Sequence, residues 1–124
     1  MGGENIKIRT KTLSINVGQL ALMLPHNAVN KVYISQIVRS SASVAANYRA
    51  VARAKSDADF INKLKICEEE IDETQLWLEL LAEFNRSFET NILPLHKECD
   101  ELLSIFVASI KTFRKRVEDA KIKK

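Results

Sequence analysis

The sequence is poor in the residues that make turns. Its 124 residues include only three Gly and two Pro. An all-β sandwich or barrel needs a turn signal every ~8–12 residues, so the composition argues against that class of fold. Aromatic residues are also scarce, at 6%, whereas apolar residues as a whole reach 46%. A chain of this length and apolar content is expected to form one domain with a core of its own.

Several functional signals are missing as well. No run of 18 apolar residues that would span a membrane is present, and the N-terminal MGGENIKIRTK has no apolar segment typical of a secretory signal. Cys67 and Cys99 stand apart from each other and from any histidine cluster, so we expect two reduced core thiols in a cytoplasmic protein. His26 and His96 have no nearby ligand partner, and no metal or cofactor is predicted.

The apolar residues recur with the period of α-helices. Four segments carry them at alternating steps of four and three, and no segment alternates like a strand. This pattern predicts an all-α, up-down-up-down four-helix bundle, as a single domain over residues 1–124. Thr10 and Ser56 are expected to cap helices, and Asn91–Pro94 to make the last break. The expected helices cover residues 10–24, 28–55, 57–90 and 95–120.

Polar residues interrupt the predicted seam between the second and third helices. Two interpretations are open. In one, a buried hydrogen-bonded layer fixes the helix register. In the other, the charged members are solvated residues beside the seam. The first predicts that Arg39→Ala costs several kcal/mol, because it leaves a buried carboxylate unpaired. The residues of this layer are Arg39, Ser40, Asn47, Glu70 and Glu73.

The charge is small overall but unevenly distributed. The chain has 19 basic and 16 acidic residues, for a formal net charge of +3. Residues 1–65 and the stretch from Lys111 onward are basic, whereas residues 66–85 hold seven acids and no base. Such asymmetry suits either a polyanionic partner or pairing between copies. The basic tail from Lys111 is more typical of a solvated helix end than of a binding arm.

A surface that binds phosphates is predicted around the second and third helices. No acid lies between Ala28 and Ser56, so the bases there lack local partners. They would bind RNA or DNA with mostly sequence-independent affinity; alternatively, they meet the acidic belt of an adjacent copy. Tyr48 is the nearby aromatic, which gives little support for base stacking. The predicted residues are Lys31, Arg49, Arg53, Lys55, Lys63 and Lys65.

Apolar residues on the predicted third helix exceed what one seam needs. Leu76, Trp77, Leu80 and Phe84 are expected at an oligomer interface, where aromatics are favoured, or else on a second face packed inside the bundle. The carboxylates of residues 68–73 lack the Glu-x-x-His pairs of a di-metal bundle. No Ser–His–Asp or Cys–His set can be assembled, so an enzyme is not predicted.

Three consecutive stretches resemble a known family. They are QIVRSSASVAANYRA (Gln36–Ala50), ARAKSDADFINKLK (Ala52–Lys65) and EEEIDETQLWLELL (Glu68–Leu81). In order and spacing they resemble the four-helix bundle proteins also called 23S rRNA intervening-sequence proteins. The similarity covers residues 9–90, and the fourth helix matches only in pattern. The resemblance implies a short bundle, a homopentamer and a bacterial source, and it implies no catalytic residues.

Charge and resemblance together predict a non-catalytic nucleic-acid-binding protein. It would bind structured RNA through the basic surface of an oligomeric ring, with no membrane and no small-molecule substrate as partner. The competing class is a protein-interaction scaffold, in which the charge asymmetry serves self-assembly or docking of a partner. Binding measured against salt separates the two, because phosphate binding weakens as salt rises.

Overall fold

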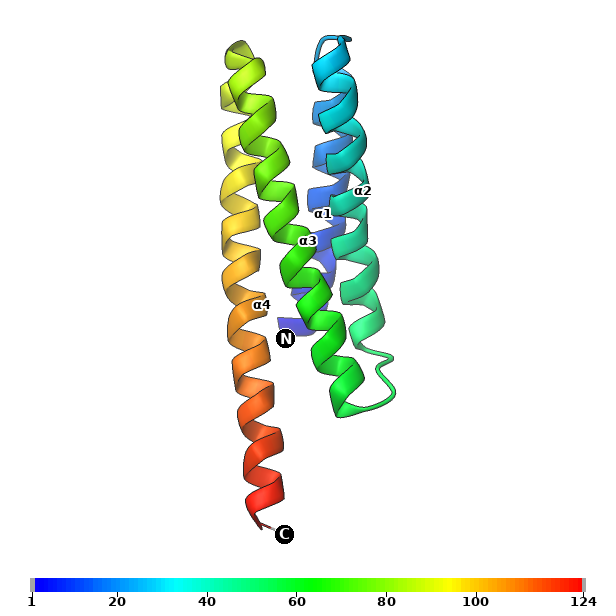
Figure 1. The fold of residues 1–124 in the computed structure, drawn as a ribbon, viewed down its shortest axis with the longest axis vertical. Helices are drawn as coiled ribbons and strands as arrows, with labels where there is room; N and C mark the ends of the chain where they lie inside the picture. The colour runs from blue at the N-terminus through cyan, green and yellow to red at the C-terminus, as the bar shows by residue number, and fades with distance from the viewer. Residues whose placement is uncertain (1, 124) are drawn as a thin grey trace.

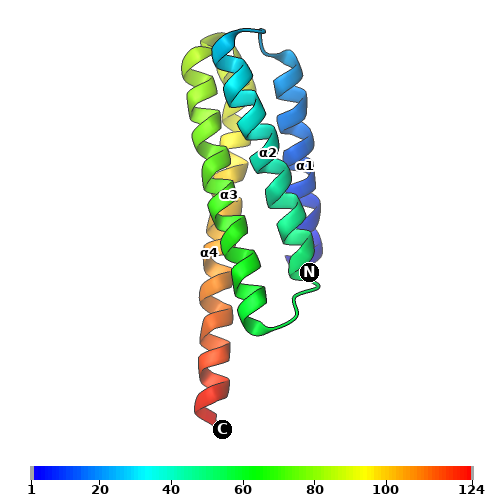
Figure 2. The same cartoon turned by 45° about the vertical axis from the view of Figure 1, so that its right-hand side comes forward.

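Four long helices lie side by side in the computed structural model, which describes residues 2–123 (Figures 1 and 2). No strand occurs in this range, so the predicted all-α four-helix bundle is confirmed. A short 3-10 turn, η1, separates the last two helices. The elements are α1 (Gly2–Met23), α2 (Ala28–Val51), α3 (Asp57–Phe84), η1 (Arg86–Phe88) and α4 (Glu89–Lys123).

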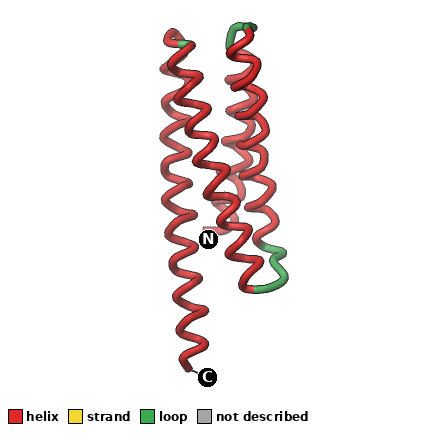
Figure 3. Tube along the Cα trace, in the orientation of Figure 1, coloured by secondary structure: helices red, strands yellow, loops and turns green. Residues whose placement is uncertain are grey.

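The helices alternate in direction, and short loops join them at the two ends of the bundle (Figure 3). Helix α2 packs against both α1 and α3, while α4 packs mainly against α3 and less extensively against α1. Within residues 2–123, the backbones of α1 and α3 do not approach each other. These two helices therefore lie on a diagonal, and their outward faces point to opposite sides of the bundle.

Side chains cap the first turns of α2 and α3. Asn27 precedes α2 with extended backbone, and its Oδ1 accepts a hydrogen bond from the Asn30 N–H at 2.8 Å. Ser56 plays the same part for α3, where its Oγ accepts from the Asp59 N–H at 3.1 Å. Such caps satisfy N–H groups that a first turn leaves without helical partners. The expected cap at Ser56 is confirmed.

Helix α1 begins eight residues earlier than predicted, at Gly2. Thr10 is no cap; it is fully buried in the middle of the helix, and its hydroxyl donates to the Lys7 carbonyl at 3.1 Å. A threonine can occupy a helix interior in this way because its hydroxyl bonds back to the preceding turn. The apolar stripe extends one turn further toward the N-terminus, since Ile6 is also buried.

The break before α4 lies at Asn85, not at Asn91–Pro94 as predicted. Helix α3 ends at Phe84 instead of residue 90, and its 28 residues span about 42 Å. Pro94 lies inside the second turn of α4, where it costs the helix one backbone hydrogen bond. Helix α2 also ends earlier than predicted, at Val51 instead of residue 55, because residues 52–56 form the loop to α3.

A buried amide pair ties the start of α2 to the end of α3. Asn30 and Asn85 are 1% and 6% exposed, and each side chain donates to the other, at 2.9 and 2.8 Å. Asn30 also donates to the Pro25 carbonyl at 2.9 Å, and Asn85 to the Leu81 carbonyl at 2.8 Å. The Asn85 side chain thereby satisfies a carbonyl at the end of α3, which accounts for the position of the break.

All four helices contribute apolar side chains to one core. Its largest fully buried members include Leu13, Ile37, Ile71, Leu78, Leu102 and Phe106. Cys67 and Cys99 lie in this core as free thiols, in the positions expected from their place in the apolar stripes. Burial raises the pKa of each thiol to about 12. Among the described helices, none is long and apolar enough to cross a membrane.

Candidate nucleic-acid interface

The fold brings most bases of the two basic parts of the sequence to one end of the bundle. The start of α1, the end of α2, the first turns of α3 and the end of α4 meet there (Figure 1). Eleven of the 16 acidic residues lie instead within residues 67–104. We call the first region the basic end. The basic end thus differs in charge from the rest of the bundle, where most of the acids lie along the middle of α3 and α4.

Four bases surround a shallow hollow of about 430 Å³ at the basic end. Lys7 and Lys11 come from α1, Arg49 and Arg53 come from α2, and alanines of α2 line the remainder. In the part of the chain that the structure describes, none of the four makes an ion pair. We call this feature the cationic hollow.

Arg9 lies between Lys7 and Lys11 in the sequence, but within the described residues it pairs with acids of α4, which the two lysines do not. Its guanidinium donates to both carboxylate oxygens of Glu98 on α4, at 2.6 and 2.9 Å, and to Glu101 at 3.1 Å. These hydrogen bonds raise the pKa of Arg9. Lys7 and Lys11 lie on the side of α1 that faces α2, where the nearby stretch of α2 contains no acid.

The predicted phosphate-binding residues do not all lie together. Arg49 and Arg53 line the cationic hollow, as part of the basic end. Lys63 pairs with Asp59 at 2.8 Å, and the same carboxylate accepts from the Lys55 backbone N–H at 3.0 Å. The hydrogen bond from Lys63 is the main cause of a lowered pKa at Asp59. The charge of Lys63 is therefore already partly balanced, while the Lys55 and Lys65 side chains make no ion pair within residues 2–123.

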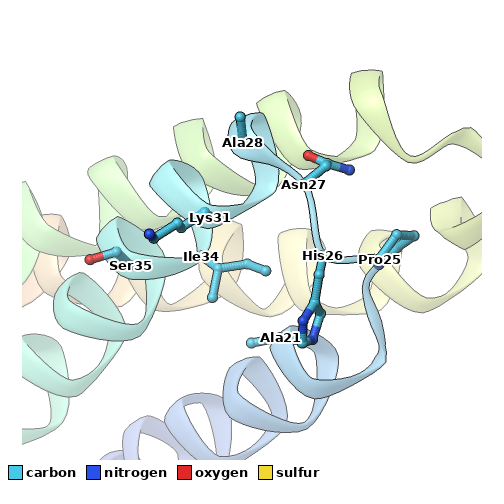
Figure 4. A pocket seen from close by; sticks show the side chains of 8 residues that line it. All are labelled: Ala21, Pro25, His26, Asn27, Ala28, Lys31, Ile34 and Ser35. Atoms are coloured by element: carbon cyan, nitrogen blue, oxygen red, sulfur yellow. The ribbon is translucent and has the colours of Figure 1, made fainter.

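Lys31 is separated from the other predicted bases. It lies in the first turn of α2, on a hollow of about 520 Å³ beside Pro25 and His26 (Figure 4). Lys31 and Arg49 are 18 positions apart in the sequence, which corresponds to about 27 Å along the helix. Lys31 therefore belongs to the opposite end of the bundle and not to the basic end.

Lys7 and Lys11 are absent from the set predicted from the sequence. Their spacing of four residues on one side of a helix is a detectable signal, but the predicted first helix began only at Thr10. That Lys7 and Lys11 lie beside α2 also depends on how the helices pack. Of the four bases in the cationic hollow, Arg49 and Arg53 were predicted from the sequence, and Lys7 and Lys11 are added by the fold.

The predicted polar layer divides into a buried and an exposed part. The hydroxyls of Ser40 and Thr74 share a hydrogen bond of 2.8 Å, and both residues are fully buried. Asn47 takes no part in this bond, because its side chain donates to the Ser43 carbonyl at 2.9 Å within α2. The buried part of this layer is therefore the bond between the Ser40 and Thr74 hydroxyls.

Arg39 forms an ion-pair cluster on the surface beside that contact. It donates to Glu70 at 2.9 Å and to Glu73 at 2.6 Å. Partial burial tends to raise the pKa of Glu70, but hydrogen bonds led by that of Arg39 outweigh it and lower the pKa. The Arg39 side chain is 48% exposed, so the cluster is not a buried layer. The several kcal/mol expected for Arg39→Ala therefore becomes about 1 kcal/mol or less.

The predicted interface residues of α3 lie partly at the surface. Leu76 is 46% and Phe84 56% exposed, whereas Leu80 and Trp77 are half-buried. Tyr33 of α2 stacks on Trp77 with ring centroids 5.9 Å apart. Trp77 thus packs within the bundle, and the more exposed Phe84 also lies against Tyr33, with ring centroids 6.0 Å apart. We call the predicted set the α3 apolar face.

A second apolar stripe follows the outer side of α1. Ile8, Ile15 and Leu22 are 58%, 50% and 87% exposed. A spacing of seven residues places all three on one side of the helix, opposite the side that carries the core residues. We call them the α1 apolar stripe. Because α1 and α3 lie on a diagonal, this stripe and the α3 apolar face point in opposite directions.

The described residues contain no group of three or more His, Cys, Asp and Glu side chains that could hold a metal ion. His96 of α4 instead contacts a single carboxylate, that of Glu79 on α3, at 2.8 Å. This contact joins two exposed side chains across the α3–α4 pair.

Comparison with known proteins assigns the chain to a family. A model of the family described as 23S rRNA-intervening sequence protein matches residues 5–108. The chain belongs to the 23S rRNA-intervening sequence protein family. The match confirms the family suggested by the motifs of α2 and α3, and it also includes most of α1 and the first part of α4.

A solved structure has the same fold as this member of the 23S rRNA-intervening sequence protein family. It comes from Bacteroides thetaiotaomicron and is described as a protein with unknown function from the S23 ribosomal protein family. The two share 31% sequence identity and a TM-score of 0.79, over 90% of this chain and 99% of the other. No curated protein matches the chain.

Proposed function

We propose that this family member is a non-catalytic nucleic-acid-binding protein of the bacterial cytoplasm. It binds structured RNA through the basic end of a ring that is assembled from copies of the chain. The observation that carries the proposal is the cationic hollow, in which four bases from two helices lie together without acidic partners. Unpaired bases in a cluster are suited to phosphate groups, whose charge they neutralise with release of counterions.

The distribution of charge along the bundle supports the same function. Most acids lie within residues 67–104, outside the basic end. A polyanion that approaches the molecule is therefore attracted to the basic end more than to the acidic middle of α3 and α4. This orients binding without contacts to particular bases, which is typical of sequence-independent affinity.

The two apolar faces support assembly into a ring. In a dimer, the α1 apolar stripe of one copy would contact the α3 apolar face of the other. The α3 face of the first copy and the α1 stripe of the second would then be free to bind further copies. Repetition of such a head-to-tail contact closes a ring when the rotation allows it. Every basic end then lies on the same side of the ring.

Salt-dependent binding tests the nucleic-acid part of the proposal. The test variant is Arg49→Gln with Arg53→Gln, and the matched control is Lys31→Gln with Lys97→Gln, which removes two charges near the opposite end. The test variant should bind all RNA sequences more weakly. On duplex DNA it should lower the magnitude of the slope of log K against log salt by about 1.8, if each arginine contacts one phosphate. The control should match the wild type.

Two results would overturn nucleic-acid binding. One is a wild-type protein that binds neither RNA nor DNA at low salt. The other is an affinity that stays the same between ~50 and ~200 mM salt, since phosphate contacts always weaken in that range. An effect of the arginine variant on oligomer size alone would favour the protein-interaction scaffold instead.

Cysteine cross-linking tests the ring. Leu22→Cys and Phe84→Cys place exposed thiols on the two apolar faces, near the same end of the bundle. Mixed single variants should form disulfide dimers, each single variant alone should not, and the double variant should give a ladder that ends at a closed ring. Cys67 and Cys99 are buried and stay unreactive. Self-linking of a single variant, or sedimentation of the wild type as a monomer, would contradict this contact.

A further inference from the structure

Three surface hollows at the basic end share residues and so form one track. The cationic hollow shares Lys7 and Arg49 with a second hollow, which is also lined by Tyr48 and Phe60. A third hollow is lined by Phe60, Phe113 and Arg116. Lys7, Arg49 and Phe60 thus connect a surface on α1 and α2 to one on α4. Glu4 is the acid among the described residues that line the track.

Two aromatic rings occupy the middle of this track. Phe60 of α3 and Phe113 of α4 are stacked, with centroids 4.2 Å apart and an interplanar angle of 27°. Both rings are only half-buried, and both line a hollow. The sequence suggested Tyr48 as the aromatic near the bases, and the fold adds this pair. An aromatic ring that is open to a groove gives an unpaired base a surface on which to stack.

The end of α4 continues the track beyond the other helices. Helix α4 projects past the loop between α2 and α3 (Figures 1 and 2). From Arg114 to Lys123, every residue except Val117 is exposed. This projecting end carries five bases and two acids, and it lies outside the residues that the family model matches. Its bases are Arg114, Lys115, Arg116, Lys121 and Lys123.

We propose that the track binds a single-stranded segment of nucleic acid. The backbone phosphates lie along the cationic hollow and the projecting end of α4, and a base stacks on the Phe60–Phe113 pair between them. Bases within a duplex are stacked on each other and offer no free face, so this aromatic pair favours an unpaired strand. The proposal rests on the proposed function and deepens it, because it names the form of nucleic acid that this surface selects.

The test compares two RNA oligonucleotides of equal length at low salt, a single-stranded uridine-rich strand and a blunt duplex. Phe113→Leu keeps an apolar side chain beside Phe60 but removes the aromatic ring. It should weaken single-strand binding roughly 5- to 150-fold, the range expected for one lost stacking contact. Duplex binding should change less than about twofold, since the phosphate contacts remain.

A matched variant and a second substitution complete the experiment. Phe88→Leu alters another half-buried phenylalanine, which lies in η1 at the opposite end, and it should leave single-strand binding unchanged. Lys115→Gln with Arg116→Gln should lower the single-strand salt slope by about 1.4, if each base contacts one phosphate. Thermal unfolding followed by circular dichroism checks that each variant is folded.

The outcomes separate this inference from the proposed function. Single-strand affinity that is equal in Phe113→Leu and Phe88→Leu would overturn the track, as would a wild type that prefers the duplex. Either result would leave nucleic-acid binding intact. A wild type that binds neither oligonucleotide would overturn the proposed function together with the track.

Discussion

Replacing Asn85 by alanine tests whether the buried amide pair stabilises the bundle. The substitution removes the two hydrogen bonds with Asn30 and the one to the Leu81 carbonyl. It leaves at least two buried polar groups, the Asn30 Oδ1 and the Leu81 oxygen, without these partners. Each such group costs about 1–3 kcal/mol. The free energy of unfolding should therefore fall by about 2–6 kcal/mol, and Tm by roughly 8–24 °C for a domain of this length.

Urea and thermal unfolding, followed by circular dichroism at one protein concentration, measure this loss. Asn16→Ala is the matched control, because Asn16 is exposed on α1 and its change should stay within about 0.5 kcal/mol. The double variant Asn30→Ala with Asn85→Ala should lose less than the sum of the two single losses, since the partners share their bonds. An Asn85→Ala protein as stable as the control would refute a stabilising role for the pair.

Two further predictions concern charge and thiol chemistry. Arg39→Ala should cost about 1 kcal/mol or less near pH 7, because the ion pair is half-exposed. The pKa of Glu70 is lower in the folded protein than in the unfolded chain. The ion pair with Arg39 therefore stabilises the fold at pH values above the pKa of Glu70 in the unfolded chain. This stabilisation is lost as the pH falls through the pKa of Glu70 in the folded protein. Urea unfolding across an acid pH series should thus show wild type and variant converging; a difference that persists in acid would contradict this. Cys67 and Cys99, with pKa values near 12, should resist a thiol reagent at neutral pH until urea unfolds the protein; rapid labelling of the native state would contradict their burial.

The helices were predictable where a local pattern specifies them. The seam of α3 runs through Leu64, Cys67, Ile71, Leu78 and Leu81 at helical spacing, and all five are buried. Ser56 was also recognisable, because an N-cap depends only on the few residues that follow it. The motifs of α2 and α3 were sufficient to suggest the family, which the family match confirms.

The helix ends were less predictable, because burial decides them. Thr10 and Asn85 are both polar and both fully or nearly fully buried. Thr10 continues a helix, because its hydroxyl bonds back to the Lys7 carbonyl, whereas Asn85 ends one, where its side chain bonds the Leu81 carbonyl and the Asn30 amide. Pro94 is accommodated within α4, although a proline ordinarily marks a boundary.

By itself, the sequence determined the number and type of elements and which side of each is apolar, because helical periodicity is a property of neighbouring residues. Tertiary structure alone decided which elements meet. It placed Lys7 and Lys11 beside Arg49 and Arg53, and Phe60 against Phe113, although each pair of groups is about 40–50 residues apart in the chain. Antiparallel packing causes this, since it folds distant segments back to one end of the bundle.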